Sequence, residues 1–359
     1  MMGLNAGNAQ FTGQAFTQQR ARTAEELALV HRVKRVRFGG CAREVLLQNL
    51  NGPCPLLALG NALLLRGDVG VPPGWSELPV SRLIASVREV IEASAASAGG
   101  AGMAGATGAA RSARAARAAR AAASLPSLQR GLDVDVGLGS PCSFSDATDL
   151  LAFELCGVRV LHGWVADADA PGGALLRALS YEELTRRLVS GGREDAALVE
   201  AGARFLEHES TAQMTAAGLR ELHGAVREGE LCVLFRNNHF STLTKRDGAL
   251  WALVTDLGYE RVAAVAWERL DSLHGDTQLA SPDFGDPQAY VADSVAGADM
   301  AGTASAAYDV DLMLAMQMQA MEDRRARDTQ QPRARRATKP PKPRDPAQDL
   351  KRHVDCCIM

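Results

Sequence analysis

The most continuous hydrophobic stretch of the chain directly follows a proline. Six leucines fall between residues 56 and 65, and Asn61 is the one polar residue among them. A surface helix would expose a polar face, so this pattern predicts a helix that is buried on most sides. Because proline has the fixed φ of the first helical position, the helix is expected to begin at Pro55.

A second hydrophobic region has a different period. The segment "ELCVLFRNNHFSTLTKRDGALWALVTD", residues 230–256, contains three apolar runs separated by "RNN" and "RDG", which are typical turn sequences. It therefore predicts an antiparallel β-meander. Because helical patterns precede it along most of the chain, the order of elements favours an α+β fold.

Shorter patterns fill the region between these two. "VKRVRF" (33–38) and "GLDVDVGL" (131–138) are typical of strands, the second because Leu and Val alternate with Asp and Gly. Residues 146–165 predict a helix, a turn at Gly157 and a strand. "SYEELTRRLVSG" (180–191) predicts a capped helix with Leu184 and Leu188 on one face, and residues 210–230 predict one helix or two short ones.

Four segments lie outside this ordered pattern. Residues 1–30 are polar, with a short helical hint at their end, and are expected to form a loosely ordered lead-in to a domain over 31–290. Residues 93–123 are rich in Ala and Arg and offer no evident face to bury, so we expect a solvated low-complexity insertion. Order is expected to weaken after the polar stretch that ends at about residue 288, until an amphipathic helix at 308–323, which a disordered basic tail at 324–359 follows.

Composition narrows the classes of function. The chain offers no long apolar window and no signal-peptide pattern, so a cytoplasmic protein is expected. Its seven cysteines form no CxxC pair and no metal-like spacing with histidine, which argues against a disulfide scaffold or a metal site. The net charge is -3, yet residues 324–353 hold 11 Lys/Arg against 3 Asp, which leaves -11 for the rest. The arginine repeat lacks stacking aromatics, so no nucleic acid partner is expected.

Candidate chemistry begins at the start of the leucine-rich helix. Cys54 directly precedes Pro55, at the expected N-cap position. There the positive end of the helix dipole favours a thiolate, and the backbone N–H is free to bond a developing oxyanion. Gln48, six residues earlier across a Gly/Pro loop, would supply a second oxyanion donor. The alternative is that Cys54 is a small cap residue and Gln48 a solvated loop residue.

A thiolate nucleophile needs a base. His239 is the best candidate among seven histidines, because it follows the "RNN" turn at the start of a predicted strand. A structural histidine is the alternative. Asp256, Asn237, Asn238 or Ser241 would be able to orient it, and the sequence does not choose among them. A cysteine at a helix start followed by a histidine on a later strand is the chain order of papain-like hydrolases.

Six blocks of the sequence resemble a known family. "QNLNGPCPLLALGNALLLR", "GLDVDVG", "LHGWV", "TAQMTAAGL", "EGELCVLFRNNHFSTLTK" and "LVTDLGY" resemble, in this order, blocks of the MINDY deubiquitinases, which are cysteine isopeptidases acting on polyubiquitin. The resemblance runs from about Phe38 to Phe284, and the Ala/Arg insertion is its main departure.

The resemblance implies a divergent papain-like cysteine protease fold and a role for each candidate. Cys54 would be the nucleophile, His239 the general base and acid, and Gln48 the oxyanion donor, with no cofactor and no metal. Partners would be polyubiquitin chains and ubiquitinated proteins, with a preference for long chains joined through lysine 48 of ubiquitin. The resemblance further implies that Val134, Trp164 and Phe235 touch ubiquitin. The alternative is that they are ordinary core residues, because each lies in an apolar strand where burial alone would explain it.

The C-terminal region adds two expectations. "YDVDLMLAMQMQAMED" (308–323) places Leu312, Ala315 and Met316 on one helical face and resembles a ubiquitin-binding helix, with an ordinary amphipathic helix as the alternative. The final "CCIM" matches a prenylation motif with Cys356 as acceptor, and the basic run before it would supply the second signal for an anionic membrane surface. A membrane-associated pool of a cytoplasmic protein is therefore expected.

Two other functions fit parts of this pattern. One is a catalytically silent ubiquitin-binding adaptor on the same fold, which would need none of Gln48, Cys54 and His239. The other is a papain-like hydrolase of unrelated peptides, against which the helix at 308–323 argues. A cysteine-type ubiquitin isopeptidase is the leading hypothesis.

Overall fold

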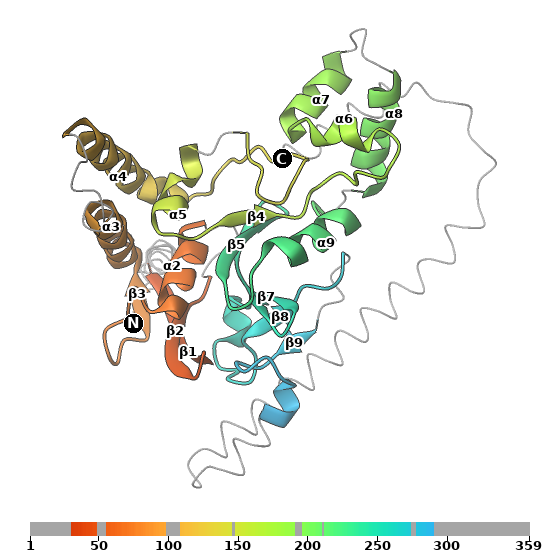
Figure 1. Cartoon of the computed structure of the whole chain (residues 1–359). Helices are drawn as coiled ribbons and strands as arrows, with labels where there is room; N and C mark the ends of the chain where they lie inside the picture. The colour runs from red at the N-terminus through yellow and green to blue at the C-terminus, as the bar shows by residue number, and fades with distance from the viewer. Residues whose placement is uncertain are drawn as a thin grey trace, which may run out of the picture.

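Two β-sheets with helices around them make up the structure (Figure 1). The structure, a computed structural model, describes residues 30–48, 55–97, 108–145, 148–190, 196–209, 212–273 and 278–290. Cys54, the predicted helix with Leu312, Ala315 and Met316, and the tail with Cys356 lie outside the described residues.

The elements have the following bounds. The strands are β1 Val30–Phe38, β2 Cys41–Leu46, β3 Glu77–Pro79, β4 Val160–His162, β5 Leu231–Arg236, β6 His239–Arg246, β7 Ala249–Leu253, β8 Trp267–Arg269 and β9 Leu279–Ala280. The longer helices are α2 Pro55–Arg66, α3 Val80–Ser97, α4 Gly108–Leu128, α7 Tyr181–Ser190, α8 Ala196–Arg204 and α9 Ala216–Ala225. The shorter ones are η1 Thr148–Leu150, α5 Leu151–Leu155, α6 Gly173–Arg177, η2 Phe205–Glu209 and η3 Leu257–Tyr259.

The strands form a small sheet in the order β2-β1-β3 and a larger one in the order β4-β5-β6-β7-β8-β9. β4 pairs in parallel with β5, and the other pairs of the larger sheet are antiparallel. Mainly antiparallel sheets combined with helices are consistent with the predicted α+β class. None of the described helices has the length and apolar character needed to cross a membrane.

The predicted meander is confirmed as β5-β6-β7. Asn237 and Asn238 have φ of 52° and 55°, and Asp247 and Gly248 have φ of 51° and 74°. Two consecutive residues with positive φ give the tight turn whose twist matches paired strands, and Asn, Asp and Gly tolerate that backbone best.

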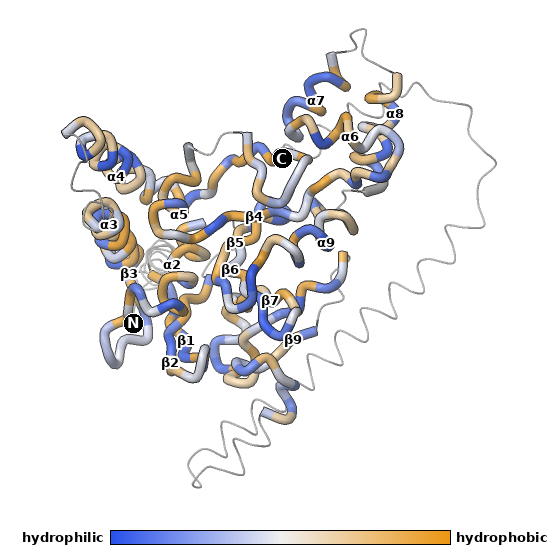
Figure 2. Tube along the Cα trace, viewed as in Figure 1, coloured by the Kyte–Doolittle hydropathy of each residue, from blue (hydrophilic) through white to orange (hydrophobic). Residues whose placement is uncertain are grey.

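The predicted leucine-rich helix is confirmed as α2, which begins at Pro55 and exposes only Arg66. Figure 2 shows its hydrophobic colouring. Asn61 is fully buried, and its side chain bonds the backbone of Leu46 twice, accepting from its N–H at 2.7 Å and donating to its carbonyl at 2.9 Å. The one polar residue of the helix therefore ties α2 to β2 and satisfies backbone groups that would otherwise be buried unpaired.

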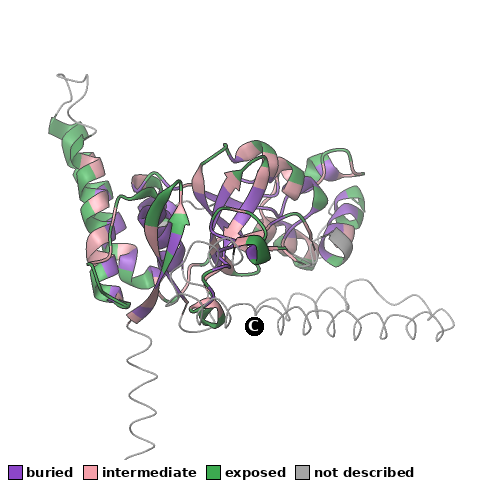
Figure 3. Cartoon of the chain, turned by 90° about the horizontal axis from the view of Figure 1, so that it is seen from below, coloured by how far each residue is buried: buried purple, intermediate pink, exposed green. Residues whose placement is uncertain are grey.

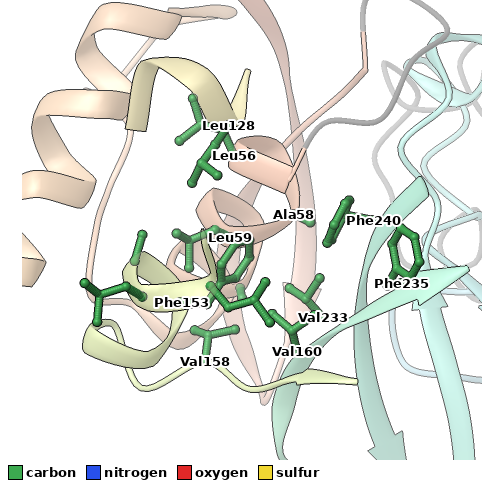
Figure 4. Close-up of a cluster of buried hydrophobic side chains, with 14 of the residues drawn as sticks. Leu56, Ala58, Leu59, Leu128, Phe153, Val158, Val160, Val233, Phe235 and Phe240 are labelled. Atoms are coloured by element: carbon green, nitrogen blue, oxygen red, sulfur yellow. The ribbon is translucent and has the colours of Figure 1, made fainter. Parts of the chain in front are cut away.

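The main hydrophobic core lies between α2 and the larger sheet. Figure 4 shows Leu59 near Phe153 and Ala58 beside Phe240. The rings of Phe153 and Phe240 stack with centroids 6.4 Å apart, and Thr242 Oγ1 donates to the Ala58 carbonyl at 3.0 Å. Figure 3 shows the buried residues gathered inside the body, with exposed residues on the outer faces of the helices. The first turn of α2 is thus fixed against β6.

The expectation of a solvated loop over 93–123 is wrong for its described parts. Residues 93–97 end α3, and residues 108–123 belong to α4, which lies beside α3 (Figure 1). Ala118 and Ala121 enter the core together with Leu125, while Arg117 faces outward and pairs with Glu154 at 2.7 Å. Small alanines at helical spacing let the helix approach closely, so a segment without large apolar residues still buries a face.

The strand predicted over 131–138 is also wrong. That segment makes only isolated bridges, from Val136 to Phe144 and from Gly137 to Ser180. The apolar residues of the segment nevertheless pack in or against the main core, Val136 and Leu138 fully buried and Val134 partly, while Asp133 is exposed. The sequence pattern therefore reports core packing of an extended segment that never joins a sheet.

The remaining predicted elements are largely confirmed. β1 includes the predicted strand over 33–38, although it begins at Val30, inside the helical hint. The helix, turn and strand predicted over 146–165 correspond to η1 with α5, Gly157 and β4. In α7 Leu184 is buried, and Thr215 caps α9 by accepting from Gly218 N at 2.9 Å. β9 lies within the predicted domain, in a polar stretch for which no strand was predicted.

Candidate active site

A cavity of about 440 Å³ lies where the chain beyond β2 meets β6 and β7. Two residues selected from the sequence, Gln48 and His239, line it although they are far apart in the chain. The complete lining is Gln48, His239, Ser241, Ala252, Leu253, Val254, Thr255, Asp256, Tyr259, Glu268 and Leu279. The structure therefore brings a predicted oxyanion donor and a predicted base to one cavity.

Gln48 is placed by backbone hydrogen bonds rather than by its own strand. Leu47 N donates to the Arg32 carbonyl at 2.9 Å, and Gln48 N donates to the Thr255 carbonyl at 2.8 Å. Gln48 also forms a parallel bridge with Asp256. Because the backbone of residues 47 and 48 is hydrogen-bonded to two other segments, the position from which the half-buried Gln48 side chain extends is fixed.

His239 reaches the cavity through the two-residue period of β6. It is the first residue of that strand and pairs with Arg236 across the turn. Ser241, two residues on, also lines the cavity, whereas Phe240 and Thr242 are buried against the core and α2. Alternation along the strand thus directs His239 to the cavity and its neighbours to the core.

The start of α2 lies close to the same end of β6. Ala58, in the first turn of α2, lies beside Phe240, the neighbour of His239 (Figure 4). Cys54, which is bonded directly to Pro55, lies outside the described residues. The described part of the site therefore consists of Gln48, His239 and the helix that follows Cys54.

The residues proposed to orient His239 differ in their surroundings. Asn238 exchanges hydrogen bonds with the Gln213 side chain at 3.2 and 3.3 Å, and Asn237 is exposed in the turn. Ser241 and Asp256 line the cavity. The Asp256 carboxylate accepts from Gly258 N at 2.6 Å and so caps η3. The cavity thus favours Ser241 and Asp256 over the two asparagines.

Sequence reasoning missed two titratable residues of the cavity, Tyr259 and Glu268. Burial is the largest cause that raises the pKa of the Tyr259 phenol, and the charges of Asp256 and Glu268 raise it further. Glu268 pairs with Ala252 across β7 and β8. Alternation of apolar and polar residues along β8 would have been needed to find Glu268 from the sequence. A strand of three residues, "WER", is too short to show such alternation.

Comparison with known proteins identifies the family. The profile of the MINDY deubiquitinases matches residues 29–284, which include both sheets and the cavity. The chain belongs to the MINDY deubiquitinase family.

Individual family members support this assignment. The chain is 34% identical to human (Homo sapiens) ubiquitin carboxyl-terminal hydrolase MINDY-1 over 257 residues, which are 70% of this chain and 53% of that protein. It is 33% identical to the Bos taurus MINDY-1 over 257 residues, with the same shares of 70% and 53%. It is 32% identical to the Mus musculus MINDY-2 over 263 residues, 71% of this chain and 42% of that protein. The chain spans about half the length of the curated relatives that it matches.

The three apolar positions expected to touch ubiquitin lie in different settings in this MINDY chain. Trp164 is 6% exposed and lies between the rings of Tyr181 and Phe205, with centroids at 4.5 and 6.3 Å. Phe235 is also 6% exposed and packs on Phe240, whereas Val134 is only partly buried against the core. Core packing accounts for Trp164 and Phe235 in this state, and contact with ubiquitin stays a prediction.

A buried histidine holds the backbone that presents Trp164. His162 has no exposed surface; its Nδ1 accepts from Trp164 N at 3.2 Å, and its Nε2 donates to the Ser143 carbonyl at 3.0 Å. These partners require the neutral ring, since protonation would place a proton on Nδ1. Burial lowers the pKa of His162 to about 4.

Acidification is therefore expected to destabilise the MINDY domain between pH 6.5 and 4. Over that range His162 becomes protonated in the unfolded chain but stays neutral in the folded chain. The free energy of unfolding that His162 contributes is therefore complete above pH 6.5 and is lost as pH falls toward 4. The difference between the ordinary histidine pKa of 6.5 and the folded value of about 4 implies that the free energy of unfolding falls by about 3 kcal/mol by pH 4. Urea unfolding at pH 7, 5.5 and 4.5 measures this free energy. His162→Gln should be less stable at pH 7 and depend less on pH; equal pH dependence of both proteins would contradict the assignment.

Within the described residues, no group of three or more His, Cys, Asp or Glu side chains converges as a metal site would require.

Proposed function

We propose that this chain is a cysteine-type ubiquitin isopeptidase that hydrolyses polyubiquitin, with a preference for chains linked through lysine 48 of ubiquitin. One observation carries the proposal. Gln48 and His239 line a single cavity, and Ala58, in the first turn of the helix that directly follows Cys54 in the chain, lies beside Phe240, the residue after His239. An adaptor would need none of these three residues, whereas a thiol hydrolase needs a nucleophile, a base and an oxyanion donor.

In the proposed mechanism, His239 takes the proton of the Cys54 thiol, and the thiolate attacks the isopeptide carbonyl. The amide of Gln48 and the backbone N–H of Cys54 donate to the tetrahedral oxyanion. His239 then gives its proton to the departing lysine amine, which leaves a thioester on Cys54. Water, deprotonated by His239, hydrolyses the thioester, which releases the carboxylate and restores the thiol. The divergent papain-like fold belongs to the same proposal.

Further parts of the chain would extend substrate binding. We assign the helix at 308–323 to ubiquitin binding through Leu312, Ala315 and Met316. Val134, Trp164 and Phe235 are assigned to further contacts with ubiquitin. Cys356 and the basic tail are assigned to a membrane surface, because a prenyl chain and a polybasic segment together suffice for stable anchoring.

Cleavage of defined chains tests the proposed function. Purified protein is expected to shorten chains linked through lysine 48 faster than chains of other linkages, and Cys54→Ala is expected to cleave none. A ubiquitin with an electrophilic C-terminus should modify the wild-type protein at Cys54. Chain binding without cleavage or labelling would indicate an adaptor, and cleavage of casein at a similar rate would indicate a general peptide hydrolase; either result would refute the proposal.

A further inference from the structure

β1 carries a buried lysine that is hydrogen-bonded to a segment next to the cavity. Lys34 is 5% exposed, whereas its neighbour Arg35 is exposed. The two-residue period of β1 places Lys34 on the same face as Arg32 and Val36, and Val36 packs in the cluster that contains Trp267. This face of β1 therefore lies against the region around β8.

The Lys34 ammonium binds one segment of the chain at three points. Its Nζ donates to the carbonyls of Tyr259 at 2.7 Å, Val262 at 2.7 Å and Val265 at 2.6 Å. Three carbonyls match the three N–H donors of an ammonium. Bonds from a charged donor are among the stronger hydrogen bonds, and buried carbonyls that lose such a donor are costly to leave unpaired. Residues 259–265 are thus anchored to β1.

A second bond from β1 reaches the same segment. Arg32 Nε donates to Glu260 Oε1 at 2.8 Å, and Arg32 Nη2 lies 2.7 Å from the same oxygen. Arg32 and Glu260 are both partly exposed, so this pair is weaker than the buried contact of Lys34. Both cations come from the same face of one strand.

The anchored segment is continuous with the cavity wall. The Tyr259 carbonyl accepts a hydrogen bond from Lys34, and Tyr259 also lines the cavity. Thr255 and Asp256, a few residues earlier in the chain, line the same cavity. The Thr255 carbonyl accepts the backbone N–H of Gln48 at 2.8 Å. A shift of residues 259–265 would therefore move the wall that positions Gln48.

We propose that Lys34 is a positioning residue for the isopeptidase reaction. Its ammonium anchors residues 259–265, and this anchor holds the wall formed by Thr255, Asp256 and Tyr259 and thereby the backbone of Gln48. The inference rests on the proposed function, because it assigns Lys34 a part in presenting the oxyanion donor.

The test compares two lysines that each donate to backbone carbonyls. Lys34→Met is expected to lower kcat for lysine-48-linked chains by about tenfold or more with a much smaller change in KM, since the oxyanion is held only in the transition state. Lys245→Met is the control, because Lys245 donates to the His223 carbonyl at 2.6 Å and does not line the cavity. It should leave kcat unchanged.

A double-mutant cycle separates positioning from general destabilisation. In a Gln48→Ala background, Lys34→Met should lower kcat much less than in the wild type, because its effect is routed through Gln48. Equal losses in both backgrounds, or a wild-type kcat for a folded Lys34→Met, would overturn the proposal. If Lys34→Met does not fold, the cycle is repeated with Glu260→Gln, which weakens the second bond between β1 and the same segment. A smaller loss of kcat is then expected, and this loss should again be reduced in the Gln48→Ala background.

Hydrogen exchange tests the anchor without activity. The amides of Val262 and Val265 are bonded within the segment, to the carbonyls of Tyr259 and Val262. They should exchange faster in Lys34→Met than in Lys245→Met, and unchanged exchange would overturn the anchor. A wild-type protein that cleaves no chain would refute the proposed function, and the exchange result would still decide the role of Lys34.

Discussion

Replacing His239 by alanine is expected to lower kcat for cleavage of lysine-48-linked chains by about 10² to 10⁴-fold, the usual contribution of a general acid and base. The ring lines the cavity with Gln48, and in the proposed mechanism it carries the proton from the thiol to the leaving amine. The Cys54→Ala, His239→Ala double variant should be no slower than Cys54→Ala alone, because groups that act as one unit are not additive. Steady-state cleavage of fluorescent chains gives these rates.

A second histidine provides the matched control. His223 lies in α9 and does not line the cavity, so His223→Ala should retain the wild-type rate. If His223→Ala lost as much activity as His239→Ala, or if His239→Ala retained full activity, His239 would not be the base.

Replacing Gln48 by alanine is expected to lower kcat by about 10² to 10³-fold with little change in KM, because an oxyanion donor acts only in the transition state. The Gln48 backbone bond to Thr255 does not involve the side chain, so the local structure should persist. Gln48→Glu keeps the size and removes the donor, and it should be at least as slow as Gln48→Ala.

Separate measurement of kcat and KM decides the role of Gln48. A rise in KM with unchanged kcat in Gln48→Ala would show that Gln48 binds substrate in the ground state and would exclude the oxyanion role. Melting curves of both variants verify that they remain folded.

Much of the fold was predictable because its signals are local. The buried α2, its start at Pro55 and the β5-β6-β7 meander follow from leucine density, proline geometry and the "RNN" and "RDG" turns. Errors arose where burial depended on distant partners. Ala118 and Ala121 bury a face only because neighbouring helices and the core lie beside α4, and the apolar residues of 131–138 pack on the core without a partner strand.

The candidate site shows the same division. His239 was predictable because a turn and a strand in its own neighbourhood fix its direction. Asp256 and Ser241 remained equal alternatives to Asn237 and Asn238 until the cavity separated them. Residue propensities and the period of the hydrophobic pattern indicate on which side of a helix or strand a residue lies. They do not indicate which distant segment of the chain packs against that side.

The sequence by itself determined the residue types and the local geometry of the chemistry: a cysteine next to the first residue of a buried helix, a histidine at the start of a strand and a glutamine before the helix. Only the tertiary structure decided that Gln48 and His239 share one cavity, that Asn61 ties α2 to β2, and that Lys34 anchors the cavity wall. The reason is physical. Buried polar groups take the partners that folding brings to them, and those partners are set by packing between distant segments rather than by local pattern.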